Sequence, residues 1–189
     1  MTMQIKRKKD NRVVKCIFHR VADIPGGVTV ETASLGGKAL FEGTPLGKGN
    51  GGIYNVVKTA QIITTATATA TAYEVAKGHH FKPGDRFSAA DADGQVITSI
   101  DKSDPAKDTI TLTATLGKEV AVGEVAFESA GANTTLKYQP IAIAGSNEDV
   151  DPDGDNLWVD AWVIGVVNDS NAPATDAAIK SALKGIVYV

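Results

Sequence analysis

The fold is decided by the middle of the chain, residues 73–128, which read YEVAKGHHFKPGDRFSAADADGQVITSIDKSDPAKDTITLTATLGKEVAVGEVAFE. Short runs rich in Val, Ile, Thr, Tyr and Phe alternate here with turn signals, and no run has the period of a helix. We expect strands over 73–77, 85–89, 95–101, 108–115 and 124–128. We expect turns at Lys82-Pro83-Gly84-Asp85, Asp93-Gly94, Ser103-Asp104-Pro105 and Val122-Gly123. Short strands at this spacing are typical of a small β-barrel.

Strand-like runs continue on both sides of this unit. Residues 138–168 contain YQPIAIAG and NLWVDAWVIGVV, and the chain ends in IVYV. Residues 65–72 read TATATATA, which is either a strand with threonines on one face or a flexible surface stretch. Residues 172–184 have an apolar face, a cap at or beside Thr175 and a terminating Gly185, so they predict a helix. The sequence therefore predicts a mainly β protein, a small β-barrel or sandwich module with one short C-terminal helix.

Three ranges are predicted along the chain. Residues 1–24 form a basic N-terminal arm and the first strand, and the arm contains the run Lys6-Arg7-Lys8-Lys9. Residues 25–137 form a β-rich module. Residues 138–189 supply C-terminal strands and the helix, which pack on the same core or on an adjacent one. The basic run is either a solvated end or a tether for an acidic surface.

The composition argues against several classes of protein. The chain of 189 residues has a formal net charge of -3, which disfavours a protein that binds nucleic acid through its whole surface. No apolar stretch approaches the ~20 residues that span a bilayer, so a membrane partner is not expected. Cys16 is the single cysteine, so neither an intrachain disulfide nor a cysteine metal cluster can form. Its apolar neighbours predict that Cys16 is buried, and the cysteine usage predicts a protein made in a reducing cytoplasm.

Two adjacent histidines make KGHHFKPGDRF, residues 77–87, the first candidate for a catalytic or metal site. Adjacent residues of a strand point to opposite faces, so His79 and His80 are a poor pair of metal ligands. The simpler interpretation is a turn with one histidine at its rim. The enzymatic alternative uses His79, His80 and Asp85, whose side chains suit acid–base catalysis. We expect the turn, and we expect that the protein is not an enzyme.

An acidic loop, DVDPDGDNLWVD at residues 149–160, follows most of the calcium-loop pattern D-x-[DN]-x-[DN]-G-x5-E. Carboxylates at alternate positions offer the oxygen ligands that a hard cation prefers. The candidate ligands are Asp149, Asp151, Asp153, Asp155 and Asp160. However, the last position holds Asp in place of Glu, and Pro152 constrains the loop. The alternative is an acidic surface turn, so calcium is the one cofactor that the sequence suggests.

Trp158 and Trp162 lie four residues apart in a strand-like run, so their indoles are expected to share a face. Large aromatic pairs are common in cores and at subunit interfaces, and we expect this pair in one of those places. The alternative is an exposed platform that binds a sugar, to which Tyr138 also contributes.

The C-terminal segment NLWVDAWVIGVVNDSNAPATDAAIKSALKGIVYV, residues 156–189, resembles the end of tailed-bacteriophage head fibre proteins, a class of capsid-surface proteins. The shared pattern is an apolar strand with WVDAW, a short loop with AP, a small helix and a final strand. The segments EVAKGHHFKPGDRF, VITSID and DTITLTATL are similar to a β-module of phage and prophage virion proteins. The resemblance covers residues 25–189 loosely, is closest at the C-terminal end, and includes no catalytic motif.

This resemblance implies a non-enzymatic structural protein, a head fibre or capsid decoration subunit on the exterior of a phage or prophage virion. It also implies a homotrimer that contacts the major capsid protein and is made in the bacterial cytoplasm. The alternative is a carbohydrate or cell-surface binding module whose partner is a cell-surface glycan.

Overall fold

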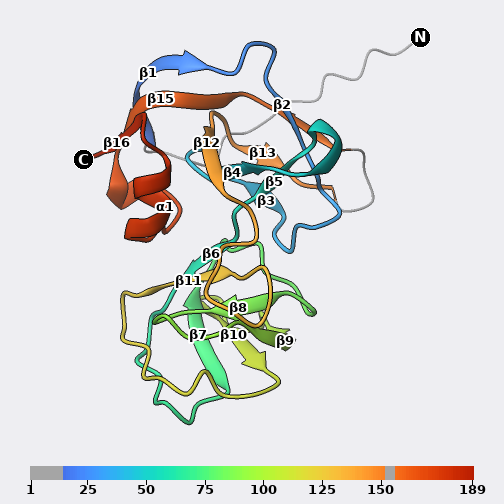
Figure 1. Ribbon diagram of the computed structural model, residues 1–189, viewed down its shortest axis with the longest axis vertical. Helices are drawn as coiled ribbons and strands as arrows, with labels where there is room; N and C mark the ends of the chain where they lie inside the picture. The colour runs from blue at the N-terminus through green and yellow to red at the C-terminus, as the bar shows by residue number, and fades with distance from the viewer. Residues whose placement is uncertain (1–14, 152–155) are drawn as a thin grey trace.

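The computed structural model describes residues 15–151 and 156–189, which form two lobes, one above the other in Figure 1. We call residues 59–137 the middle lobe, and the described residues before 58 and after 137 the terminal lobe. Strands account for 42% of the chain and helices for 7%, which confirms a mainly β fold with one short helix near the C-terminus. None of the described helices has the length and apolar character needed to cross a membrane.

The middle lobe is a curled sheet of six strands. Its order is β6 (Thr59–Gln61), β11 (Val125–Glu128), β8 (Arg86–Ser88), β9 (Gln95–Asp101), β10 (Lys107–Leu112) and β7 (Ala72–Ala76). The first and last strands of this order approach each other, because Ile62 forms an antiparallel bridge with Val75. The curl produces a half-barrel, which agrees with the predicted small β-barrel or sandwich.

Local chemistry explains this sheet. Burial alternates along β10 and β7, because successive side chains of a strand point to opposite faces. Among the buried side chains, the Phe87 ring lies with its centroid 5.4 Å from that of Tyr73 and 5.5 Å from that of Phe81. The turn predicted before β8 is present: Gly84 has a φ of 93°, and the Asp85 N–H donates to the Lys82 carbonyl at 3.1 Å. Glycine adopts this positive φ without steric strain, so the sequence PG specifies the turn.

The alternating residues 65–72 do not form a continuous strand. Ala66 bridges to Val120, the Ala70 N–H donates to the Thr67 carbonyl in a turn, and only Ala72 belongs to β7. Most of these side chains are exposed. Small side chains offer little apolar area to hold one face against a core, and the stretch is accordingly an irregular surface segment.

The terminal lobe is built on a sheet of eight strands. Its path is β1 (Ile17–Asp23), β15 (Ala161–Val167), β12 (Pro140–Ala144), β4 (Pro45–Lys48), β5 (Tyr54–Val56), β2 (Val28–Val30) and β14 (Leu157–Val159), with β16 (Ile186–Tyr188) beside β15. A separate pair joins β3 (Ala39–Leu40) to β13 (Glu148–Asp149). Only Asp160 separates β14, which pairs with β2, from β15, which pairs with β12. The sheet therefore bends back on itself.

One α-helix, α1 (Ala177–Ala182), is present in the described part of the chain, together with the short 3-10 helices η1 (Asn50–Gly52) and η2 (Asp169–Asn171). The side chain of Asp176 accepts from the Ile179 N–H at 2.7 Å, so the predicted cap lies directly after Thr175. Ile179 and Leu183 pack against β1, β15 and β16 in a core that also contains the buried Cys16. The helix is shorter than the predicted range, because its first residues form an extended loop after η2.

The sheets divide the chain differently from the predicted ranges 1–24, 25–137 and 138–189. The range 25–137 is split, because β2 to β5 belong to the terminal lobe and β6 to β11 form the middle lobe. The terminal lobe combines strands from all three ranges, since β1 pairs with β15 and β2 with β14. Strands that pair across such sequence distances carry no local signal of one another. The basic run Lys6-Arg7-Lys8-Lys9 lies outside the described residues.

Candidate functional site

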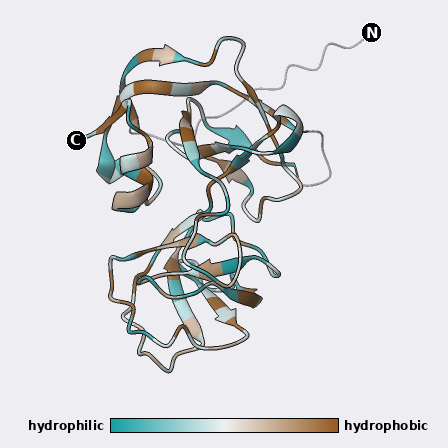
Figure 2. Ribbon diagram, in the orientation of Figure 1, coloured by the Kyte–Doolittle hydropathy of each residue, from teal (hydrophilic) through white to brown (hydrophobic). Residues whose placement is uncertain are grey.

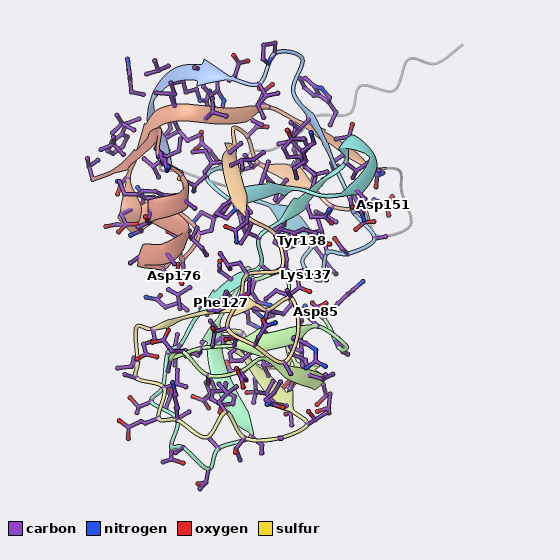
Figure 3. The ribbon with its side chains drawn as sticks, in the orientation of Figure 1. Asp85, Phe127, Lys137, Tyr138, Asp151 and Asp176 are labelled. Carbon is purple, nitrogen blue, oxygen red and sulfur yellow. The ribbon has the colours of Figure 1, made fainter. Side chains whose placement is uncertain are left out.

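A buried charge cluster lies where the two lobes meet. Lys58 occupies the chain segment that links β5 to β6, and its side chain is only 2% exposed. Its Nζ lies 2.7 Å from Asp85 Oδ2 and 3.7 Å from Glu128 Oε2. Figure 3 shows Asp85 and Lys137 near the place where the lobes meet. The Lys58 ammonium group thus supplies compensating charge to two buried carboxylates.

The second chain crossing between the lobes is tied to the same cluster. Lys137 lies on the segment that returns to the terminal lobe, and its Nζ is 2.7 Å from Glu128 Oε1. Burial raises the pKa of the Glu128 carboxyl, and the ammonium groups of Lys58 and Lys137 oppose this effect. Asp85 also accepts from the Lys82 N–H at 2.8 Å. The cluster therefore joins both crossings to the turn before β8, and its carboxylates are occupied by structural partners.

His79 and His80 are both buried, so the prediction that one of them lies at the rim of the turn is wrong. The exposed part of the turn is Pro83 and Gly84, whereas residues 79–81 run inward because Phe81 enters the middle-lobe core. His79 Nδ1 accepts from the Phe81 N–H at 3.2 Å. On the other side of the ring, His79 Nε2 lies 3.1 Å from Asp108 Oδ2.

Burial also changes the protonation of both histidines. It lowers the pKa of His79 to about 4, against the opposing effect of the Asp108 carboxylate. It lowers the pKa of His80 to about 4 as well, and the Lys58 ammonium adds to this shift. Both imidazoles are therefore neutral at pH 7. Within the described chain the ring nitrogens of His80 have no hydrogen-bond partner, and no hydrogen bond joins either histidine to Asp85.

A terminal-lobe loop around Gly36 packs against residues 79–82, which we call the histidine segment. The Gly36 N–H donates to the His80 carbonyl at 2.9 Å. Lys82 Nζ donates to the Ala33 carbonyl at 2.6 Å, and Lys102 Nζ donates to the Gly36 carbonyl at 2.8 Å. A Cβ atom at Gly36 would lie 2.1 Å from the Phe81 carbonyl oxygen, so only glycine allows this approach. The segment KGHHFKPGDRF thus forms a turn and a contact between the lobes.

A cleft of about 520 Å³ also lies between the lobes, on the side of α1. Its walls come from β6 and the end of β7 in the middle lobe and from the segment between η2 and α1 in the terminal lobe. The two lysines on these walls are paired, Lys77 with Asp108 at 2.5 Å and Lys180 with Asp169 at 2.7 Å. The cleft walls therefore combine small side chains with compensated charges.

The acidic loop remains a predicted calcium site. Asp149 ends β13, Asp151 follows it, and Asp160 separates β14 from β15; all three are exposed. Figure 3 shows Asp151 at the outer side of the terminal lobe, away from the lobe junction. Asp153 and Asp155 lie outside the described residues. In residues 15–151 and 156–189 no three His, Cys, Asp or Glu side chains gather closely enough to hold a metal ion.

Trp158 and Trp162 occupy different environments. Trp158 is 62% exposed, and its Nε1 donates to the Gly26 carbonyl at 2.7 Å, so it is not in the core of this chain. Trp162 is half-buried against the core around α1, and the Arg20 guanidinium lies 5.6 Å from its ring centroid. The two side chains differ in exposure, and Asp160 separates the strands β14 and β15 on which they lie. A role for either residue at a subunit interface remains a prediction.

The strands β1, β15 and β16 carry an apolar surface that sequence reasoning did not find. Five large apolar side chains on and beside these strands are between 45% and 62% exposed: Phe18, Val21, Ile164, Val187 and Val189. Their elements are far apart in the sequence, so the group exists only after the strands pair. The one available signal was that both alternating faces of residues 161–167 are apolar. Similarly, nothing local marked Asp85 and Glu128 as partners of Lys58.

Comparison with known proteins finds no family profile, no curated protein and no solved structure that matches this chain.

Proposed function

We propose that this protein is a non-enzymatic structural subunit of a phage or prophage virion, a head fibre or capsid decoration protein on the capsid exterior. The observation that carries the proposal is how the chain uses its polar residues. Of the three candidate catalytic residues, Asp85 pairs with Lys58, His79 faces Asp108, and His80 is buried. This arrangement suits a protein that contributes a binding surface rather than a catalytic site.

Two further features support the proposal. The head-fibre resemblance is closest over residues 156–189, which supply β14, β15, β16 and α1 to the terminal lobe. Residues 156–189 also carry four of the eight exposed large apolar side chains of the described chain: Trp158, Ile164, Val187 and Val189. In the proposed role the chain forms a homotrimer and contacts the major capsid protein.

The location of the protein tests the proposal directly. An antibody against the full chain is applied to phage particles released from the bacterium that encodes it, after separation on a density gradient. We expect the chain to sediment with the heads and the label to lie on their outer surface. Particles from a strain that lacks the coding sequence are the control. A chain confined to the soluble fraction, or a label on tails alone, would contradict the proposal.

A carbohydrate or cell-surface binding module is the second candidate, and the exposure of Trp158 favours it. The hydrogen bond from Nε1 to Gly26 holds the indole in one orientation while most of the side chain stays accessible. An exposed, fixed aromatic ring is suited to stacking on a sugar. Binding on a glycan array that disappears in Trp158→Ala and persists in Val122→Ala would support this function. Absence of binding across a broad array would contradict it.

A further inference from the structure

We propose that the side chains of Lys58 and Asp85 form an isopeptide bond, an amide that joins Lys58 Nζ to Asp85 Cγ. Glu128 serves as the acid–base group for this single reaction. The bond forms within one chain and requires no added enzyme or cofactor. The inference goes beyond the proposed function and does not depend on it.

The two reacting groups are in contact and are shielded from water. Lys58 Nζ lies 2.7 Å from Asp85 Oδ2, and the two side chains are 2% and 7% exposed. The other lysines that pair with carboxylates in the described chain are at least 30% exposed, so their ammonium groups stay hydrated. A contact of this kind brings the amine close to the carboxyl carbon, where reacting atoms about 3–3.5 Å apart are near the geometry of attack.

Backbone hydrogen bonds hold all three residues in position. The Glu128 N–H donates to the Lys58 carbonyl at 3.0 Å, which fixes β11 beside the segment that carries Lys58. The Asp85 carbonyl accepts from the Ile97 N–H at 2.8 Å. Glu128 is also paired with Phe87, two residues after Asp85. The groups are therefore ordered before they react, so the reaction requires little further ordering.

The surroundings favour an uncharged product over an ion pair. Val57, next to Lys58, and Phe87 are both buried. Figure 2 shows hydrophobic segments in the strands of both lobes, above and below the place where the lobes meet. A buried ion pair keeps a desolvation cost, because neither charge is hydrated. The amide carries no charge, so its formation removes this cost, and the exclusion of water protects it from hydrolysis.

Glu128 is placed to move protons between the reacting groups. Its Oε2 lies 3.7 Å from Lys58 Nζ and has no hydrogen-bond partner within the described residues, whereas Oε1 contacts Lys137 Nζ. Burial raises the pKa of this carboxyl, against the opposing effect of the two ammonium groups. A raised pKa favours the protonated carboxyl, which can donate to a leaving oxygen. The Lys82 N–H, 2.8 Å from Asp85 Oδ2, can stabilise negative charge that develops on that oxygen.

The reaction is a condensation that balances without a further reactant. One Nζ proton passes to a carboxylate oxygen of Asp85, which converts the ion pair into an amine and a carboxylic acid. The Nζ lone pair forms a bond to Cγ, and a second Nζ proton reaches the same oxygen through Glu128. The bond between Cγ and that oxygen breaks, and the oxygen leaves as water. Glu128 ends with the proton content with which it began, and nothing is oxidised or reduced.

The bond would give this chain a covalent link that it cannot obtain from cysteine. Cys16 is the single cysteine, so no disulfide can form within the chain. The isopeptide bond joins the segment between β5 and β6 to the turn before β8. Such a link stabilises a fold by restricting the unfolded chain.

The test is the mass of the full chain, purified in its folded state, then denatured and measured by mass spectrometry. The wild-type chain should be lighter than its sequence by one water molecule. Asp85→Ala removes the reacting carboxyl and should keep the full mass of its sequence. Glu128→Gln keeps the size of the side chain but cannot exchange the proton. It should therefore keep its full mass when the wild-type reaction is complete.

Digestion of the denatured chain locates the bond. Trypsin and a glutamate-specific protease together should release residues 49–74 and 78–86 as one branched peptide, because they remove the residues 75–77 that joined them. Trypsin should fail to cleave after Lys58. Cleavage after Lys180 is the internal control, because its exposed pair with Asp169 should stay unlinked.

A wild-type chain with the full mass of its sequence would overturn the inference. A water loss located at Asp93-Gly94 or Asp153-Gly154, where a succinimide gives the same mass change, would also overturn it. Complete bond formation in Glu128→Gln would overturn the role of Glu128. Circular dichroism verifies that the variants are folded, and the wild-type measurement tests the bond without any variant.

Discussion

His79 and His80 are adjacent in sequence, and burial lowers the pKa of both imidazoles. Burial holds the pKa of each imidazole at about 4, below the ordinary value of 6.5. Between these two values the unfolded chain binds protons that the folded chain does not. The contribution of the pair to stability is therefore present above about pH 6.5 and is lost as the pH falls toward about 4.

The expected loss is roughly 1–3 kcal/mol for each histidine over this range. Urea unfolding at several pH values between about 7 and about 4 measures it. The raised pKa of Glu128 acts in the opposite direction, because the folded chain then binds the extra proton on acidification. The comparison is therefore made between the wild-type protein and the His79→Gln, His80→Gln double variant, whose stability should depend less on pH. His19→Gln, at an exposed position, should keep the wild-type dependence. Equal slopes in the wild-type protein and the double variant would contradict the prediction.

Lys58 is the residue whose loss should damage the lobe junction most. Lys58→Met keeps the side-chain volume but leaves Asp85 without its ammonium partner and Glu128 with Lys137 alone. Removing one partner of a buried ion pair costs about 3–5 kcal/mol. Lys180→Met is the control, since its pair with Asp169 is partly exposed and should cost less than about 1 kcal/mol. Chemical denaturation of both variants measures this difference in the free energy of unfolding. Similar losses in the two variants would contradict the prediction that the Lys58 cluster stabilises the lobe junction.

At the scale of the elements, the loop around Gly36 is the part of the terminal lobe that packs against the histidine segment. Gly36→Ala would place a Cβ atom 2.1 Å from the Phe81 carbonyl oxygen, so the loop would have to move away. Such overpacking costs about 1–3 kcal/mol. Faster hydrogen exchange of the Gly36 amide, which donates to His80, would accompany the loss. Gly131→Ala is the control, because its nearest neighbour is the flexible side chain of Asn133. A Gly36→Ala protein of wild-type stability would contradict the close approach between Gly36 and the Phe81 carbonyl.

Most individual elements were predictable from local sequence. The strands β7 to β11 lie within a few residues of their predicted ranges, because alternation and turn residues act over short distances. The helix is marked by its own cap, Asp176. The segment 65–72 shows the limit of this reasoning, since strict alternation of Thr and Ala satisfies the strand pattern without supplying the burial that maintains a strand.

At the scale of the whole molecule, the two lobes are expected to unfold together. The charge cluster around Lys58 and the loop around Gly36 both join them, so loss of one lobe would expose buried groups of the other. Both tryptophans lie in the terminal lobe, so their fluorescence reports that lobe, whereas far-ultraviolet circular dichroism reports both. We expect the two transitions to coincide in the wild-type protein and to separate in Lys58→Met. Separate transitions in the wild-type protein would show that the lobes are independent.

Local sequence accounts for the mainly β character, the strands and turns of residues 73–128, the short helix with its cap and the burial of Cys16. These features depend on residues close together in the chain, where side-chain alternation and backbone preferences act directly.

The division into lobes, the burial of His79 and His80, and the pairing of Asp85 with Lys58 arise only when the whole chain has folded. The exposure of Trp158 and the pairing of β15 with β1 and β16, which carry exposed apolar side chains, arise in the same way. Each of these features depends on strands that meet from distant parts of the chain. Such pairing is set by the burial and hydrogen bonding of the whole sheet, and no short stretch of sequence contains it.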